Sequence, residues 1–211
     1  MKQSRLDSLS DGIFAIILTL MTFELKIPFM SGVVDDQRLW QAIVHLAPSF
    51  LSFVLSFALL FTYWHAHHYI VSVYAKSVNR RLTSINAIFF FFVALIPFST
   101  SLIGNYNQTK LAIIIYALNI LAIGIALLWM RSYVLSSGHI EHTFVLSSEK
   151  KRGFIRIIAP MVFAVISIVV CFYSTWIAFL LLTLATLFNL FSRSTRLVNW
   201  LIKKTKEEIV G

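Results

Sequence analysis

The chain has 211 residues, of which 58% are hydrophobic and only 13% are charged, and its mean hydropathy is +0.81. This composition excludes an ordinary soluble domain and indicates an integral membrane protein that uses lipid as part of its solvent. The formal net charge of +9 could suggest a nucleic-acid partner, but the basic residues gather on one side of the predicted membrane. We therefore expect a lipid bilayer, and no nucleic acid, as the partner of these charges.

Stretches of about 17–25 mainly apolar residues are long enough to cross a bilayer as helices. The turn between the last two such stretches is limited to Tyr173, Ser174 and Thr175, so we expect these two to form an antiparallel hairpin. The fold class is thus an all-α membrane protein, with residues 1–211 forming a single transmembrane domain. Its six predicted spans are residues 11–29, 42–64, 83–104, 111–130, 156–173 and 175–191.

The basic residues predict the orientation of these spans. All but three of the 18 Lys and Arg residues fall on the side of the membrane that holds the N-terminus, the exceptions being Lys26, Arg38 and Lys110. Because basic residues are retained in cytoplasmic loops, both termini are predicted to be cytoplasmic. Residues 192–211 then form a basic cytoplasmic tail close to anionic lipid headgroups.

The first span opens with ionisable and polar residues, among them Arg5, Ser10 and Asp11. Ionisable groups at the mouth of a membrane span are costly and are therefore candidates for a functional role. Ser10 and Asp11 are expected to point toward neighbouring helices, with the Asp11 carboxylate buried and in need of a partner.

A stripe of side chains follows on the same helix. At the spacing i, i+3, i+4 and i+7, Ile16, Thr19, Leu20 and Phe23 share one face. One hydroxyl and three bulky apolar groups suit a narrow hydrophobic constriction that gates a pore by dewetting. Ordinary helix packing produces the same pattern, so helical spacing alone leaves both interpretations open.

The second span ends in a cluster of aromatic and imidazole side chains. His65 and His68 share a face, whereas His67 points elsewhere, and no metal-binding motif accompanies them. We therefore expect no metal and no cofactor. Instead, one imidazole is expected to meet Asp11 or Ser10, because both groups lie at the cytoplasmic depth.

The later spans carry few polar groups. Pro97 is expected to kink or end the third helix near its outer side. Asn119 and Gly124 are compatible with close helix packing, and Cys171, the single cysteine, is interpreted as a packing residue. The chain has neither the TVGYG filter nor the arginine ladder of a voltage sensor. It also has no P-loop or nucleophile elbow, so we expect it not to be an enzyme.

Several motifs in the first half of the chain resemble those of the lysosomal potassium channel family called transmembrane protein one-seven-five, specifically its prokaryotic members. The hallmark Arg-x-x-x-Phe-Ser-Asp stands here as residues 5–11, with Leu9 in the place of the phenylalanine. Further matches are Trp64-x-x-His67-His68, Asn86 and Ile96-Pro97-Phe98-Ser99-Thr100-Ser101-Leu102.

This resemblance implies a homotetramer in a prokaryotic cell membrane whose first helices line a central pore for potassium and other monovalent cations. It places the constriction at Ile16, Leu20 and Phe23, with the Thr19 hydroxyl bearing on ion preference. It also implies a structural polar network of Arg5, Ser10, Asp11, Trp64, His67 and Asn86.

Two further classes of function remain as alternatives. A proton-coupled secondary transporter would use Asp11 and His67 as a proton relay and would lose transport in Asp11→Asn. A membrane-embedded enzyme would need a nucleophile, a base and an orienting group together, and the sequence offers no such set.

Overall fold

The computed structural model describes residues 3–27, 29–32, 34–75, 77–136 and 147–190, and within these ranges it contains helices and no strand. The all-α prediction is therefore confirmed for this part of the chain. The predicted basic tail, residues 192–211, lies outside the described residues. The elements in chain order are α1 (Gln3–Leu20), η1 (Met21–Glu24), α2 (Asp36–His45), α3 (Ala47–His68), η2 (Tyr69–Tyr74), α4 (Arg80–Ala94), α5 (Ile96–Asn105), α6 (Lys110–Ser136), α7 (Ser147–Val170) and α8 (Thr175–Leu190).

Five helical segments of the described chain are long and apolar enough to cross a membrane. α8 is shorter, with 16 residues, so a sixth crossing stays a prediction. The expected tight hairpin is present, because α7 ends at Val170, α8 begins at Thr175 and the two helices pack against each other. The five candidate spans are Gln3–Glu24, Ala47–Tyr74, Arg80–Asn105, Lys110–Ser136 and Gly153–Val170.

The first helix differs most from its predicted bounds. It begins at Gln3 rather than at residue 11, so the polar motif lies on the helix and not ahead of it. The α-helix ends at Leu20 and tightens into the 3₁₀ turn η1, which carries Phe23. Residues 5 and 11 can therefore be assigned to faces of one helix.

Two breaks in the helices occur next to proline. α2 ends at His45 and α3 begins at Ala47, with Pro48 in the first turn of α3. α4 ends at Ala94 and α5 begins at Ile96, with Pro97 in its first turn. Proline lacks an N–H and its ring crowds the carbonyl four residues earlier, so a new helix starts at each site, as predicted for Pro97.

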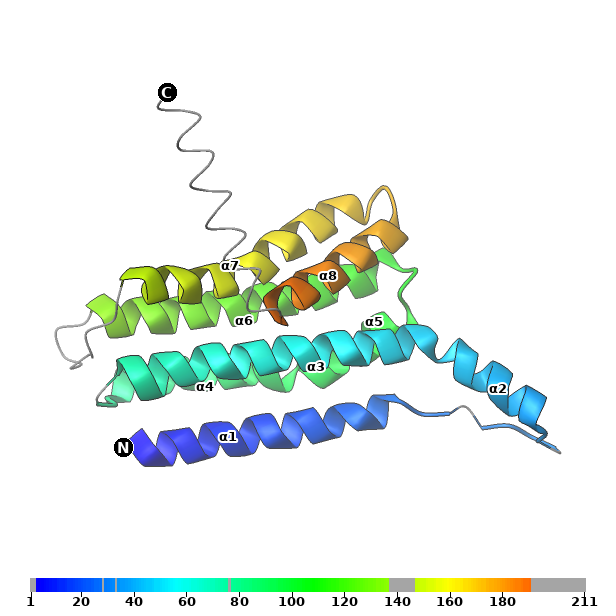
Figure 1. Ribbon diagram of the computed structural model, residues 1–211, viewed down its shortest axis with the longest axis horizontal. Helices are drawn as coiled ribbons and strands as arrows, with labels where there is room; N and C mark the ends of the chain where they lie inside the picture. The colour runs from blue at the N-terminus through cyan, green and yellow to red at the C-terminus, as the bar shows by residue number, and fades with distance from the viewer. Residues whose placement is uncertain (1–2, 28, 33, 76, 137–146, 191–211) are drawn as a thin grey trace, which may run out of the picture.

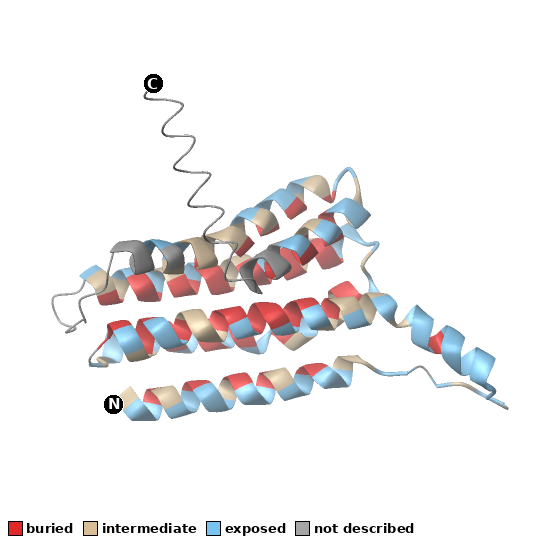
Figure 2. Ribbon diagram, in the orientation of Figure 1, coloured by how far each residue is buried: buried red, intermediate tan, exposed pale blue. Residues whose placement is uncertain are grey.

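The helices form a layered bundle in which α1 lies at one edge (Figure 1). α1 runs along α3 and α4, and α6 is central, packing against α4, α5 and α7. α3 packs against α5 and α8, and α2 extends beyond the end of the bundle. Buried positions concentrate on α3 and α6, while much of α1 is exposed (Figure 2).

One end of the bundle collects basic side chains, and we call it the basic end. α1 and α4 begin there, and α3 and α6 end there. Its basic residues among those described include Arg5, Arg80, Arg81, Arg131 and Arg156.

Candidate functional site

α1 has one face packed inside the subunit. Its buried residues are Leu6, Ser10, Phe14 and Ile17, and Met21 of η1 continues them. Spacings of three and four residues place these side chains on one side of a helix. This face fixes α1 against α3 and α4, and the opposite face is left for other contacts.

The exposed face of α1 and η1 carries the predicted stripe. Ile16 is 59% exposed, Leu20 45% and Phe23 64%, and Thr19 is also exposed. Phe23 keeps this exposure although η1 departs from α-helical spacing. Packing within the subunit therefore does not bury these side chains.

The Thr19 hydroxyl is oriented by its own helix. Its Oγ1 donates to the carbonyl oxygens of Ala15, at 3.1 Å, and Ile16, at 2.8 Å. A threonine hydroxyl has one proton and two acceptor lone pairs. Since the proton is used within the helix, the oxygen offers only acceptor character to the exposed side.

Asp11 is held by Trp64 of α3. The indole Nε1 donates to Oδ1 of Asp11 at 2.9 Å. The ring of Trp64 in turn stacks on His68, with centroids 5.9 Å apart and an interplanar angle of 21°. The polar edge of α1 is thus attached to α3 through an aromatic donor.

His67 forms a separate pair with Asn86 of α4. Its Nε2 lies 2.8 Å from the Asn86 Oδ1, and the two residues are 2% and 1% exposed. The imidazole stacks on Phe89 at 5.1 Å and 10°, and Phe14 of α1 lies 6.1 Å from it. This pair joins α3 to α4 directly beneath the buried face of α1.

The expected contact between an imidazole and Asp11 or Ser10 is not formed. Asp11 is exposed rather than buried, and Ser10 donates to the carbonyl of Leu6 in its own helix at 2.7 Å. The rings of Phe14 and Phe89 enclose His67, whereas the Asp11 carboxylate keeps access to solvent. The six predicted network residues therefore divide into two pairs, with Arg5 exposed on α1 and Ser10 bonded locally.

Sequence reasoning missed two anchors at the start of α1. The Gln3 amide donates to the carbonyls of Val71 at 2.8 Å and Ala75 at 3.0 Å, and Ser72 donates to Asp7 Oδ1 at 2.7 Å. Both reach η2, a π-helical turn whose wider geometry changes the usual carbonyl pairing. The spacing of Gln3 and Asp7 by four residues was the available signal.

Among the described residues, no group of three or more His, Cys, Asp or Glu side chains is placed to hold a metal ion. The histidines near the end of α3 instead contact aromatic rings, such as Tyr69, which lies 4.9 Å from His65 edge to face. The described polar residues around α1 therefore hold this helix in place, and its other face presents an exposed apolar surface.

These features define a multi-pass, all-α membrane protein whose N-terminal helix exposes an apolar face. Residues 5–97 match the model of a family described as endosomal/lysosomal potassium channel TMEM175. A solved structure described as a lysosomal potassium-selective channel TMEM175 homolog from Chamaesiphon minutus superposes with a TM-score of 0.75 at 25% identity, covering 89% of this chain and 95% of that one. The chain is therefore similar to the TMEM175 family over residues 5–97 and to this solved homolog over most of its length.

Curated bacterial relatives show the same similarity. A protein of Chryseobacterium sp. is 31% identical over 60% of this chain and 62% of its own length, and one of Chamaesiphon minutus is 35% identical over 57% and 60%. A Streptomyces collinus protein is 29% identical over 66% and 68%. All three are named potassium channels. The chain spans about three fifths of the length of the first two relatives.

Proposed function

We propose that this protein is a potassium-permeable cation channel that assembles as a homotetramer, with the α1 helices of four subunits around a central pore. Its relatives are named potassium channels, and the similar solved structure is described as a potassium-selective channel homolog. These relatives are channels and not enzymes, in line with the expectation that the chain carries no catalytic set. The similarity to this family supports potassium as the permeating ion, and the geometry of α1 supports a pore along that helix.

The observation that carries the proposal is the exposure of the α1 stripe. In lipid alone, an exposed apolar face needs no protein partner. The α1 face, however, also presents Arg5 at its basic end and the Thr19 hydroxyl within its length, both exposed. A charge and an oriented acceptor on the same helix side suit a partly hydrated path better than acyl chains.

In the proposed tetramer, Ile16, Leu20 and Phe23 form successive apolar rings. Such rings restrict water, and they gate an ion path by dewetting rather than by closing a rigid plug. The Thr19 oxygens lie between them as acceptors for a passing cation. This mechanism uses no TVGYG filter, which the sequence lacks.

The anchors described above set the radius of this path. Trp64 holds the flank of α1 and Phe14 packs over the His67–Asn86 pair. The position of the apolar rings therefore depends on polar contacts that touch no ion. Arg5, Ser10, Asp11, Trp64, His67 and Asn86 act in this proposal as structural residues.

We assign the protein to a prokaryotic cell membrane, with six crossings that include α8 and with both termini cytoplasmic. The basic end supports this orientation, because Arg and Lys are retained on the cytoplasmic side. The transporter alternative has less support. Asp11 bonds to Trp64 and His67 bonds to Asn86, so the two groups do not form the direct proton relay that it requires.

Potassium flux into liposomes and single-channel recording test the proposal. Ile16→Asn places a polar group in the constriction, and Ile125→Asn on α6 is the matched control, since the two side chains are 59% and 57% exposed. A barrier lowered by about 1.4 kcal/mol raises the current about tenfold. We expect this increase for Ile16→Asn only. Absence of flux, or equal currents in both variants, would contradict a pore along α1.

Cross-linking tests the assembly independently of conduction. With Cys171, the free and buried cysteine, replaced by alanine, Ile16→Cys is expected to form disulfide-linked dimers under mild oxidation, because copies of α1 face a common axis. Ile125→Cys is expected to remain monomeric on denaturing gels. A monomeric Ile16→Cys would show that the stripe faces lipid.

A further inference from the structure

The turn η2, at the end of the second candidate span, departs from α-helical hydrogen bonding. The Ala75 N–H donates to the carbonyl of Ile70, five residues earlier, at 3.2 Å. In an α-helix the same N–H would donate to Val71, four residues earlier. Turns with the wider pairing are rare and occur frequently at functional sites. The contacts around η2 must therefore favour this register.

Gln3 of α1 holds the carbonyl that Ala75 would use in an α-helix. Its Nε2 donates to the carbonyl oxygen of Val71 at 2.8 Å and to that of Ala75 at 3.0 Å. The last four carbonyls of a helix have no partner within it, and the two protons of a glutamine amide can serve two of them. Gln3 thus caps the end of the α3–η2 helix from another helix.

A second hydrogen bond joins the same two elements. The Ser72 hydroxyl donates to Asp7 Oδ1 at 2.7 Å. Because Asp7 follows Gln3 by four residues, the two side chains lie on one side of α1. η2 also packs against α6, and its Val71 and Tyr74 are buried. The first turns of α1 therefore bind η2 at two points while α6 supports it from elsewhere.

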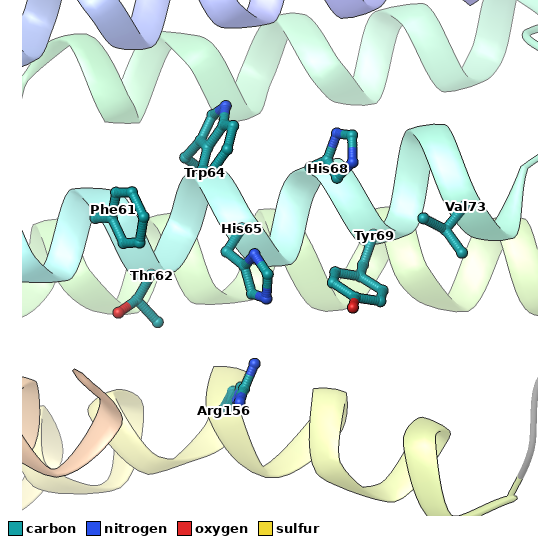
Figure 3. A pocket seen from close by; sticks show the side chains of 8 residues that line it. All are labelled: Phe61, Thr62, Trp64, His65, His68, Tyr69, Val73 and Arg156. Atoms are coloured by element: carbon teal, nitrogen blue, oxygen red, sulfur yellow. The ribbon is translucent and has the colours of Figure 1, made fainter. Parts of the chain in front are cut away.

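η2 also forms part of a pocket. Tyr69 and Val73 line a cavity of about 570 Å³ that opens between α3 and α7, together with His65 (Figure 3). A change of register along η2 changes the direction of the side chains that follow it. The shape of this pocket wall therefore depends on which carbonyl Ala75 binds.

We propose that Gln3 and η2 form a conformational switch in which the position of α1 selects the hydrogen-bond register at the end of α3. With α1 docked, Gln3 binds the Val71 carbonyl and Ala75 pairs with Ile70. When the first turn of α1 withdraws, the Ala75 N–H binds the freed Val71 carbonyl and the Ile70 carbonyl pairs with Tyr74, as in an α-helix. Val71 exchanges one donor for another, so no buried acceptor is left unpaired there.

The switch can be tested by nuclear magnetic resonance on the purified full chain in nanodiscs. The dipeptide Val-Ser occurs once in the sequence, at residues 71–72, so ¹³C-carbonyl valine combined with ¹⁵N-serine gives a single resonance. Gln3→Glu keeps the shape of the side chain and removes its donors. Gln41→Glu, at an exposed glutamine of α2, is the matched control. Gln3→Ala replaces Gln3→Glu if the added charge prevents folding.

We expect Gln3→Glu to move this resonance to a second position and Gln41→Glu to leave it unchanged. The decisive variant is Asp7→Leu, which removes the acceptor of Ser72 but retains Gln3. In a switch, its resonance lies at the second position or on the line between the two positions, whereas Asp7→Asn keeps an acceptor and the original resonance. An unmoved resonance in Asp7→Leu, or one off that line, would overturn the proposal by showing that the contacts act separately. This test is independent of ion conduction.

Discussion

The pairing of His67 with Asn86 can be tested by a double-mutant cycle with shape-conserving replacements. His67→Phe keeps a ring against Phe89, which lies parallel to the imidazole at 5.1 Å. Asn86→Leu keeps the volume of the amide. Each variant removes one end of the 2.8 Å hydrogen bond, and the double variant removes both ends.

The expected energies follow from the burial of the pair. A single replacement leaves the other polar atom buried without its partner, which costs about 1–3 kcal/mol. Replacing both partners by apolar groups of similar shape leaves the free energy of unfolding nearly unchanged. Hydrogen bonds between membrane helices give coupling energies of about 0.6 kcal/mol on average and up to about 1.7. Since His67 and Asn86 are 2% and 1% exposed, we expect a coupling in the upper half of this range.

The assay is reversible unfolding of the purified protein in mixed micelles. The control cycle combines His67→Phe with Asp11→Asn, whose carboxylate bonds to Trp64 and not to the imidazole. That cycle is expected to be additive within about 0.5 kcal/mol. Equal coupling in the two cycles, or none between His67 and Asn86, would refute the division of the polar residues into two pairs.

Three further predictions concern backbone contacts and the start of α1. Gly104→Ala should lower the free energy of unfolding, measured by thermal unfolding, by about 1–3 kcal/mol, because the added Cβ would lie 3.0 Å from the Ser49 Cα. Gly124→Ala should also lower the unfolding temperature, because its Cβ would lie 2.5 Å from the Cγ and Sδ atoms of Met161, so that this side chain would have to shift; an unchanged unfolding temperature would contradict this expectation. Gln3→Ala should lower the free energy of unfolding by about 1 kcal/mol and speed hydrogen exchange in the first turns of α1, because two carbonyls near η2 lose their donor. Unchanged exchange would show that the Gln3 hydrogen bonds do not hold the start of α1.

Part of the arrangement around α1 could be predicted, because helical spacing determines direction around a single helix, but Asp11 was expected to be buried and is exposed. Ile16 and Leu20 lie on the exposed side and Ser10 on the buried side, as α-helical spacing requires, and Phe23 stays exposed although η1 departs from that spacing. The break before Pro97 was predictable for the same kind of reason, since it depends on one residue and its own backbone.

Partners between helices could not be predicted in this way. One imidazole at the end of α3 was expected to meet Asp11 or Ser10 because these groups lie at the same depth, but depth does not fix the rotation of α3 against α1. The structure turns Trp64 toward Asp11 and His67 toward α4. The π-helical turn η2 also left no periodic signal, so the two acceptors of Gln3 were not foreseeable.

Trp64 lies between α1 and a pocket that opens between α3 and α7. Its Nε1 holds Asp11 on α1, and its ring also lines the pocket between α3 and α7. A ligand that orders this ring would therefore also restrict the flank of α1, because a planar side chain cannot rotate at one edge without moving the other. Since α1 packs on the bundle by a single buried face, the Trp64–Asp11 hydrogen bond at its edge helps to resist small rotations of the helix. A rotation of the Trp64 side chain would then shift the exposed apolar face of α1 through the Asp11 contact, without touching the proposed pore.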